Sequence, residues 1–177
     1  MDLISGWAVL AAALLFWAVG AYNRLIRLRA QAIAAFHGLA SALGDSLQLI
    51  TTHLGHPVTA GSARDQHRAD LLHAVGQVAA QLKTMRSTPL DGEKIAALGQ
   101  AYAQLLAGWE QLGALHIHLP EPDLASALEA NWLSLAAQVQ LGRVEFNRRV
   151  ESYNSAIRQF PAVLLAVALG LQPAHIL

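Results

Sequence analysis

The feature that most limits how this chain can fold is an uncharged apolar run close to its start. Residues 3–22, LISGWAVLAAALLFWAVGAY, contain no charged side chain. A helix rises about 1.5 Å per residue, so this run is about 30 Å long as a helix and matches the hydrocarbon core of a bilayer. A cleavable signal peptide is the alternative, but it needs a basic stretch before the apolar run, where Asp2 is the only charged side chain. The run predicts an uncleaved signal-anchor helix, residues 1–22, that contacts the lipid bilayer through residues 3–22.

Basic residues follow this run at once. Arg24, Arg27 and Arg29 are the first charged side chains after it. Lys and Arg beside a membrane helix favour the cytoplasmic side of the membrane. The sequence therefore predicts a single-pass protein with its N-terminus outside and its C-terminal body in the cytoplasm.

The rest of the chain has the period of amphipathic helices. Apolar residues recur every three or four positions over 25–54 and over 124–160, with shorter runs of the same kind between these ranges. The pattern is interrupted at Pro57, at Pro89 and over residues 116–122. We expect four helices, the first of them continuous with the anchor and the third capped by Asp91. Trp109 and Trp132 lie on the apolar stripes, where core packing is the expected role.

The predicted fold class is all-α. Short connections make successive helices antiparallel, so residues 23–160 are expected to form an up-down-up-down four-helix bundle with two long and two shorter helices. Residues 161–177 remain as an apolar C-terminal tail. Its uncharged segment 162–171 is too short to cross a bilayer, and it can either lie in the membrane interface or pack over the open end of the bundle.

In such a bundle the extra turns of the first and fourth helices form a two-helix neck next to the bilayer. The loop near Pro89 and the end of the chain are expected on the same side. Basic residues gather at this neck and could hold anionic lipid headgroups there. They are Arg24, Arg27, Arg29, Arg148, Arg149 and Arg158.

Four histidines are expected at the opposite, distal tip. His53 and His56 flank the first distal turn, and His116 and His118 lie in the other distal loop. Imidazole nitrogens that converge from two loops would suit Zn, Cu or Ni. Solvated loop histidines are the simpler interpretation, so we assign no metal site and keep the four residues as candidates.

The sequence lacks the motifs that announce a reaction. It has neither Gly-x-Ser-x-Gly, nor Gly-x-x-x-x-Gly-Lys, nor the Glu-x-x-His pairs of di-iron bundles, and it contains no cysteine. The 12 Lys and Arg residues balance 12 Asp and Glu, and no basic block is present to contact a row of phosphates. We expect a protein that is not an enzyme, needs no cofactor and binds no nucleic acid, and we identify no small-molecule substrate.

Two asparagines repeat beside aromatic residues in the last helix. Asn147 follows Phe146, and Asn154 follows Tyr153, so the pairs are seven residues apart. Asparagine at the margin of an apolar seam can fix helix register or oligomeric state, as in coiled coils, and Asn23 is expected opposite the same neck. Alternatively the two side chains cap groups on a neighbouring helix or face solvent.

Several segments resemble the LemA family. The clearest covers RVEFN at 143–147 and VESYNSAIRQFP at 150–161, and the entry segment 22–29, YNRLIRLR, and the Leu-Pro and Asp-Leu pairs within 119–124 are similar to family motifs as well. The resemblance implies a bacterial helical bundle anchored in the inner (cell) membrane, without established catalytic residues to transfer. The residues that carry the family signature are Asn23, Arg24, Arg143, Phe146, Asn147, Tyr153, Asn154, Phe160 and Pro161.

The preferred functional prediction is a membrane-anchored helical scaffold that binds another membrane protein or forms a homo-oligomer. A membrane-surface protein that binds or remodels lipid through the arginine neck and the 162–171 segment is one alternative. A metal-binding tip is the other.

Overall fold

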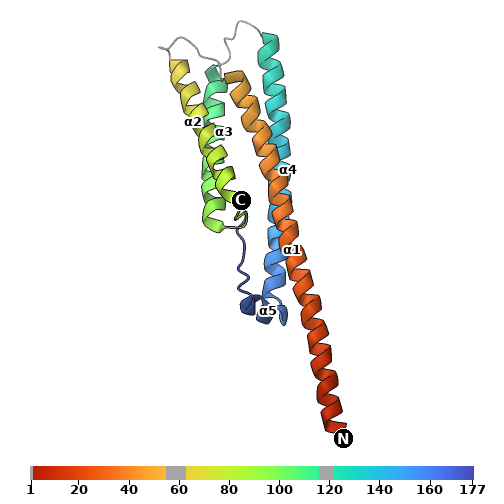
Figure 1. Ribbon diagram of the computed structural model, residues 1–177. Helices are drawn as coiled ribbons and strands as arrows, with labels where there is room; N and C mark the ends of the chain where they lie inside the picture. The colour runs from red at the N-terminus through yellow and green to blue at the C-terminus, as the bar shows by residue number, and fades with distance from the viewer. Residues whose placement is uncertain (1, 55–62, 116–121) are drawn as a thin grey trace.

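The computed structural model describes residues 2–54, 63–115 and 122–177, and these residues contain helices and turns but no strand (Figure 1). The predicted all-α fold is thereby confirmed. The helices are α1 (Asp2–Leu54), α2 (Ala63–Met85), α3 (Gly92–Leu115), α4 (Pro122–Arg158) and α5 (Ala162–Ala168).

Helix α1 is continuous over 53 residues and runs from the apolar stretch into the bundle, as predicted. Leu25 is the first buried side chain among residues 6–54, and large apolar side chains before it, including Trp7 and Phe16, are exposed. The start of α1 therefore projects alone beyond the bundle (Figure 1). Within the described residues, α1 is the helix that is long and apolar enough to cross a membrane.

Helices α1 and α4 form the longer antiparallel pair. They pack closely at Gly142, where an added Cβ would lie 3.2 Å from Leu39 Cα, and Phe36 packs edge-to-face on Phe146 with ring centroids 5.9 Å apart. Such a close approach of two helix backbones favours glycine, because a Cβ at position 142 would force Leu39 to move by a few tenths of an ångström. Glycine at position 142 thus brings the long helices together at the centre of their pairing.

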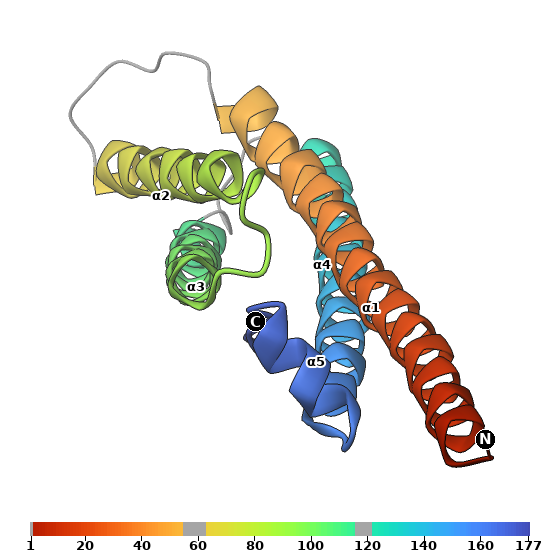
Figure 2. The same cartoon turned by 60° about the horizontal axis from the view of Figure 1, so that its bottom comes forward.

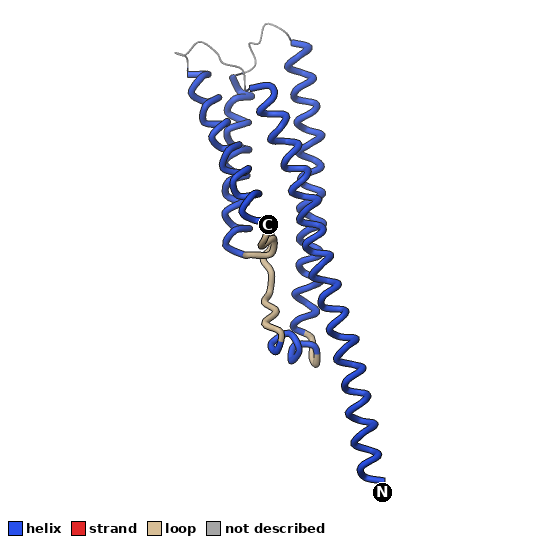
Figure 3. Tube along the Cα trace, in the orientation of Figure 1, coloured by secondary structure: helices blue, strands red, loops and turns tan. Residues whose placement is uncertain are grey.

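Helices α2 and α3 form the shorter antiparallel pair, joined by the turn around Pro89. Asp91 caps α3 as predicted, because its Oδ1 accepts hydrogen bonds from the backbone N of Glu93 (3.1 Å) and of Lys94 (3.4 Å). Helix α2 also packs on α1, and Arg68 of α2 donates to the last carbonyl of α1, at Leu54, with an Nε–O distance of 2.6 Å. Figure 3 shows the α2–α3 hairpin beside the α1–α4 pair, with α2 and α3 ending well short of the start of α1.

The seam between α3 and α4 completes the up-down-up-down arrangement. Trp109 of α3 stacks on Trp132 of α4 with ring centroids 4.4 Å apart, which confirms core packing as the role of both residues. Toward the end of the bundle from which the start of α1 projects, the two helices separate, and the C-terminal part of the chain lies between them (Figure 2).

Candidate functional site

The tail expected after the bundle is a short helix followed by an extended segment. Helix α5 is closed by Gly170, two residues after its last helical residue, with φ = +64°. Leu171 N donates to Ala166 O at 2.9 Å, and Gly170 N donates to Val167 O at 3.2 Å. This is a Schellman motif, in which a residue with positive φ closes a helix and turns the chain. Residues 171–177, called the C-terminal segment below, then run back along α4 (Figure 2).

Two asparagine side chains of α4 each hold one residue of the C-terminal segment by both of its backbone groups. Asn154 donates from Nδ2 to Ala174 O (2.7 Å) and accepts from Ala174 N at Oδ1 (2.9 Å). Asn147 binds Leu177 in the same way, with distances of 3.0 and 2.9 Å. Each pair copies the two-way hydrogen bonding between neighbouring β-strands, and we call the two together the asparagine clamp.

The spacing of the clamp matches two different backbone geometries. Asn147 and Asn154 are seven residues apart on a helix, which corresponds to a rise of about 10.5 Å. Ala174 and Leu177 are three residues apart, and an extended chain covers about 10 Å over three residues. The seven-residue repeat of α4 therefore presents its amides at the spacing that an extended antiparallel segment needs.

The aromatic residue before each asparagine anchors the clamp in the core. Phe146 and Tyr153 are both buried, so the asparagine that follows each of them is directed to the margin of the packed face. Tyr153 also donates from its hydroxyl to Gln172 O at 3.1 Å. Burial raises the pKa of Tyr153 although nearby Arg29 lowers it, and the hydroxyl therefore stays protonated and able to donate. The doubled aromatic-Asn pattern has a clear physical role here.

One sequence prediction is wrong at this point. Asn147 and Asn154 bind the chain's own C-terminal segment rather than fixing the register of a helix pair, and Asn23 is exposed. The end of the chain was expected on the same side as the loop near Pro89, and His175 does lie against Gly92 at the start of α3. From α5 the chain returns along α4 as far as Asn147, which binds Leu177. The period of α4 could not reveal these contacts, because the partner is backbone from a segment without a periodic pattern.

The C-terminal segment also reaches α3. The ring of His175 lies so close to Gly92 that an added Cβ would be 2.2 Å from His175 Cδ2, and Leu177 lies near Gly99. Ala174 between them is buried. The segment therefore bridges α4 and the start of α3, and it closes the part of the seam that the two tryptophans leave open.

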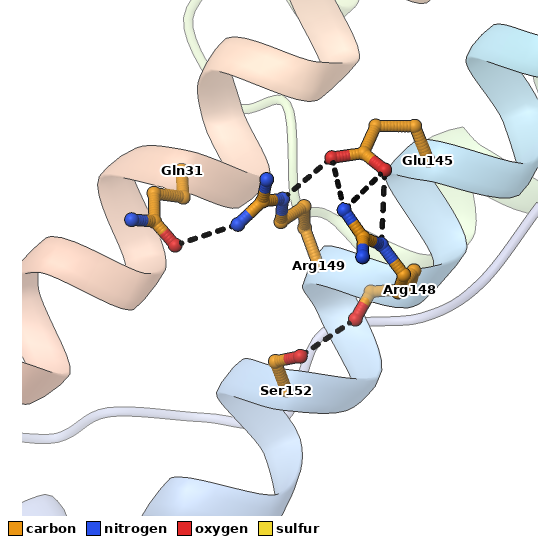
Figure 4. A network of polar contacts seen from close by, with 5 residues as sticks. All are labelled: Gln31, Glu145, Arg148, Arg149 and Ser152. Atoms are coloured by element: carbon orange, nitrogen blue, oxygen red, sulfur yellow. Dashed lines mark hydrogen bonds and ion pairs between the residues drawn. The ribbon is translucent and has the colours of Figure 1, made fainter.

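A polar network joins α4 to α1 within the bundle, away from the predicted neck (Figure 4). Glu145 accepts hydrogen bonds from Arg148 Nε (3.0 Å) and Arg149 Nε (2.6 Å), and Arg149 Nη1 donates to Gln31 Oε1 on α1 (3.1 Å). The hydrogen bonds from Arg148 and then Arg149 hold the pKa of Glu145 below its usual value. Ser152 adds a bond from its hydroxyl to Arg148 O at 2.9 Å.

The six predicted neck arginines fall into two groups. Arg148 and Arg149 share Glu145, which cancels one of their two charges. The remaining members are exposed and form no ion pair with any described residue: Arg24, Arg27, Arg29 and Arg158. The free positive charge is therefore concentrated near the end of the apolar stretch of α1.

Of the four candidate metal-binding histidines, the structure describes one. His53 is exposed at the end of α1, where Nδ1 lies 2.9 Å from Leu49 O. That geometry makes Nδ1 the protonated donor and leaves Nε2 free. His56, His116 and His118 lie outside the described residues. In the described ranges there is no group of three or more His, Asp or Glu side chains that could hold a metal ion.

Comparison with known proteins gives one assignment. The sequence model of the LemA family matches residues 58–177. This range contains the 143–161 signature and the whole C-terminal segment, whereas the entry motif at 22–29 lies outside it. No curated protein and no solved structure matches the chain. Because the match covers more than half of the chain, the chain belongs to the LemA family.

Proposed function

We propose that this protein is a non-enzymatic, membrane-anchored scaffold whose α4 binds an apolar helix of a second membrane protein or of a second copy of the chain. One observation carries the proposal: an apolar stripe on the outer face of α4. Leu133, Leu141 and Val144 are each more than half exposed, and Ala137 between them is exposed as well. Spacings of four, four and three residues place these positions on one face of the helix. We call them the α4 stripe.

The surroundings of the stripe support a helical partner. Its inner neighbours Val139 and Phe146 are buried against the rest of the bundle, so α4 is apolar on two faces although the fold needs only one. Contiguous exposed apolar surface of this kind marks an interaction site. An anchor in the bilayer would hold the stripe close to other membrane proteins and raise their effective concentration.

The test compares oligomeric state and partners of the full chain in mild detergent or nanodiscs. Leu141→Gln with Val144→Gln makes the stripe polar, and Gln138→Ala with Gln140→Ala is a control on exposed neighbours. We expect the wild type and the control to give a homo-oligomer or a stoichiometric membrane-protein complex that the stripe variant loses. A wild-type protein that is monomeric and without a partner in every condition would contradict the proposal.

We also propose that the N-terminus is outside and the bundle is in the cytoplasm at the bacterial inner membrane. The exposed Arg24, Arg27 and Arg29 support this orientation, since basic residues next to a membrane helix are retained in the cytoplasm. Reporter fusions at the C-terminus, one active only in the cytoplasm and one only outside it, test the proposal directly. Activity of the external reporter would reverse the orientation and direct the search for partners to the cell envelope.

A further inference from the structure

We propose that α5 is an interfacial helix, and that it rests in the surface of the bilayer that α1 crosses. The proposal depends on the anchor assigned above. It concerns a second and separate membrane contact, formed by the apolar face of α5 together with Phe160.

The first observation is the pattern of exposure along α5. Phe160, Leu164 and Val167 are 81%, 62% and 77% exposed, whereas Ala166 is 3% exposed. Leu164 and Val167 are three residues apart and share one face of α5, whereas Val163 and Leu165 are half-buried and Ala166 packs toward α1 and α4. Phe160 is exposed just before the helix, ahead of the cis Phe160–Pro161 bond. A helix that served only to close the bundle would turn large apolar side chains such as Leu164 and Val167 inward.

The second observation is the position of α5 along α1. The antiparallel register is fixed by Gly142 at Leu39, Phe146 at Phe36, Arg149 at Gln31 and Tyr153 near Arg29. Continued to the end of α4, this register places Arg158 beside Asn23 and α5 beside the last turns of the apolar run. The burial pattern of α1 agrees, because Ala18 and Ala21 are half-buried and Leu25 is buried on one face while their neighbours are exposed.

The third observation identifies lipid as the occupant of this face. Residues 159–174 carry no charge, and the register of α1 and α4 places the exposed arginines Arg24, Arg27 and Arg158 on the bundle side of the apolar face. Trp17 and Tyr22 are exposed on α1 at the same level. At a membrane–water interface, an apolar segment is typically followed along the chain by aromatic residues and then by basic residues. The surface is also continuous with the apolar stretch of α1.

The asparagine clamp fixes the depth of α5. Before α5 the chain is joined to the end of α4, and after Gly170 it is bound again to α4 by Asn154 and Asn147. Because both ends of α5 are tied to the same helix, it cannot swing away from the bundle. A helix held in this way would give the protein two points of attachment to the bilayer and set the height of the α4 stripe above it.

The absence of cysteine allows a direct test in the full chain reconstituted in vesicles of phosphatidylglycerol and phosphatidylethanolamine. A fluorophore on Leu164→Cys or Val167→Cys reports lipid contact through quenching by doxyl-labelled lipids. Leu14→Cys in the apolar run is the positive control, and Gln138→Cys on exposed α4 is the negative control. We expect quenching at positions 164 and 167 to be at least half of that at position 14, and at least fivefold above that at position 138.

The outcomes separate this proposal from the one on which it depends. Quenching at position 14 without quenching at 164 and 167 overturns the interfacial helix and leaves the anchor. Loss of quenching at position 14 as well overturns the anchor itself. Protection of position 164 from aqueous quenchers without quenching by lipid identifies a protein as the occupant and also overturns the proposal.

A second variant checks that the apolar face is responsible. Leu164→Gln with Val167→Gln changes exposed side chains only, so the bundle should fold, and helicity measured by circular dichroism verifies this. With the fluorophore on Phe160→Cys, the double change should reduce lipid quenching at least threefold, whereas Leu141→Gln with Val144→Gln should leave it unchanged. Equal quenching in both backgrounds would overturn the proposal.

Discussion

At the scale of single residues, the asparagine clamp recognises backbone rather than side chains. An amide side chain offers one donor group and one acceptor group on the same carbon, which is what a peptide unit in a strand requires from its neighbour. Aspartate has the same shape but offers only acceptors when ionised. The clamp itself therefore places no requirement on the side chains at 174 and 177, which are limited only by their own packing.

This difference gives a first prediction. Asn154→Asp removes the donor to Ala174 O and places a carboxylate against that carbonyl, while Ala174 N keeps its acceptor. We expect the C-terminal segment to lose about 1–2 kcal/mol of local stability, which makes amide exchange at position 174 about five- to thirtyfold faster. Hydrogen exchange measures this. Asn23→Asp, at an exposed asparagine, is the control, and equal exchange in the two variants would show that the clamp does not hold the segment.

The Glu145 network gives a second prediction, on pH. Because Arg148 and Arg149 lower the pKa of Glu145 in the folded protein, the network stabilises the fold above the unfolded pKa of Glu. This contribution is lost as the pH falls through the lower folded pKa. Titration of the Glu145 carboxyl carbon by NMR should give a midpoint below that of a free glutamate, and Arg148→Gln should raise it. A midpoint that does not move in Arg148→Gln would exclude the hydrogen bond as the cause.

At the scale of elements, most of the architecture follows from sequence because helices are local. The three- and four-residue steps after Leu25 predict α1, and Asp91 and Pro89 locate the turn between α2 and α3. The contacts of the tail were beyond this reasoning. Ala166 and Ala174 are buried by partners distant in sequence, and nothing in an uncharged apolar tail distinguishes a side chain that packs from one that contacts lipid.

The close approach of α1 and α4 gives a third prediction. Gly142→Val places methyl groups against the backbone of Leu39, so the helices must separate, and we expect a loss of about 1–3 kcal/mol in the free energy of unfolding. Gly38→Val is the matched control, since a Cβ there meets nothing within 4 Å, and it should change stability by only a few tenths of a kcal/mol. Denaturant unfolding followed by circular dichroism compares the two. Equal stability would mean that the helix contact adapts without strain.

The stacked tryptophans give a fourth prediction, for the α3–α4 seam. Trp132 is almost fully buried, so Trp132→Ala should cost about 3–5 kcal/mol through lost contacts and the cavity left behind. Trp7→Ala is the control, because Trp7 is exposed on α1 outside the bundle. Thermal unfolding in detergent should separate the two variants by many degrees. Similar melting temperatures would show that the α3–α4 seam adds little stability beyond that of the α1–α4 and α2–α3 pairs.

At the scale of the whole molecule, the bundle and the family match have different boundaries. The match begins at residue 58, but the buried face of α4 packs on α1 side chains such as Phe36 and Leu39. A fragment limited to 58–177 would leave that face in water. On α1, Ala18 and Ala21 are half-buried and Leu25 is the first buried side chain among residues 6–54.

The unbroken course of α1 has a mechanical consequence. Because α1 is one continuous helix, its apolar stretch and its far end move together as a rigid body. Residues 23–54, the part of α1 beyond the apolar stretch, are about 48 Å long. With α1 in the bilayer as proposed above, a change in bilayer thickness would tilt it, and a tilt of about 10° would move the far end sideways by about 8 Å. The tip of the bundle would thus convert a small difference in membrane thickness into a displacement about as large as the spacing between packed helices.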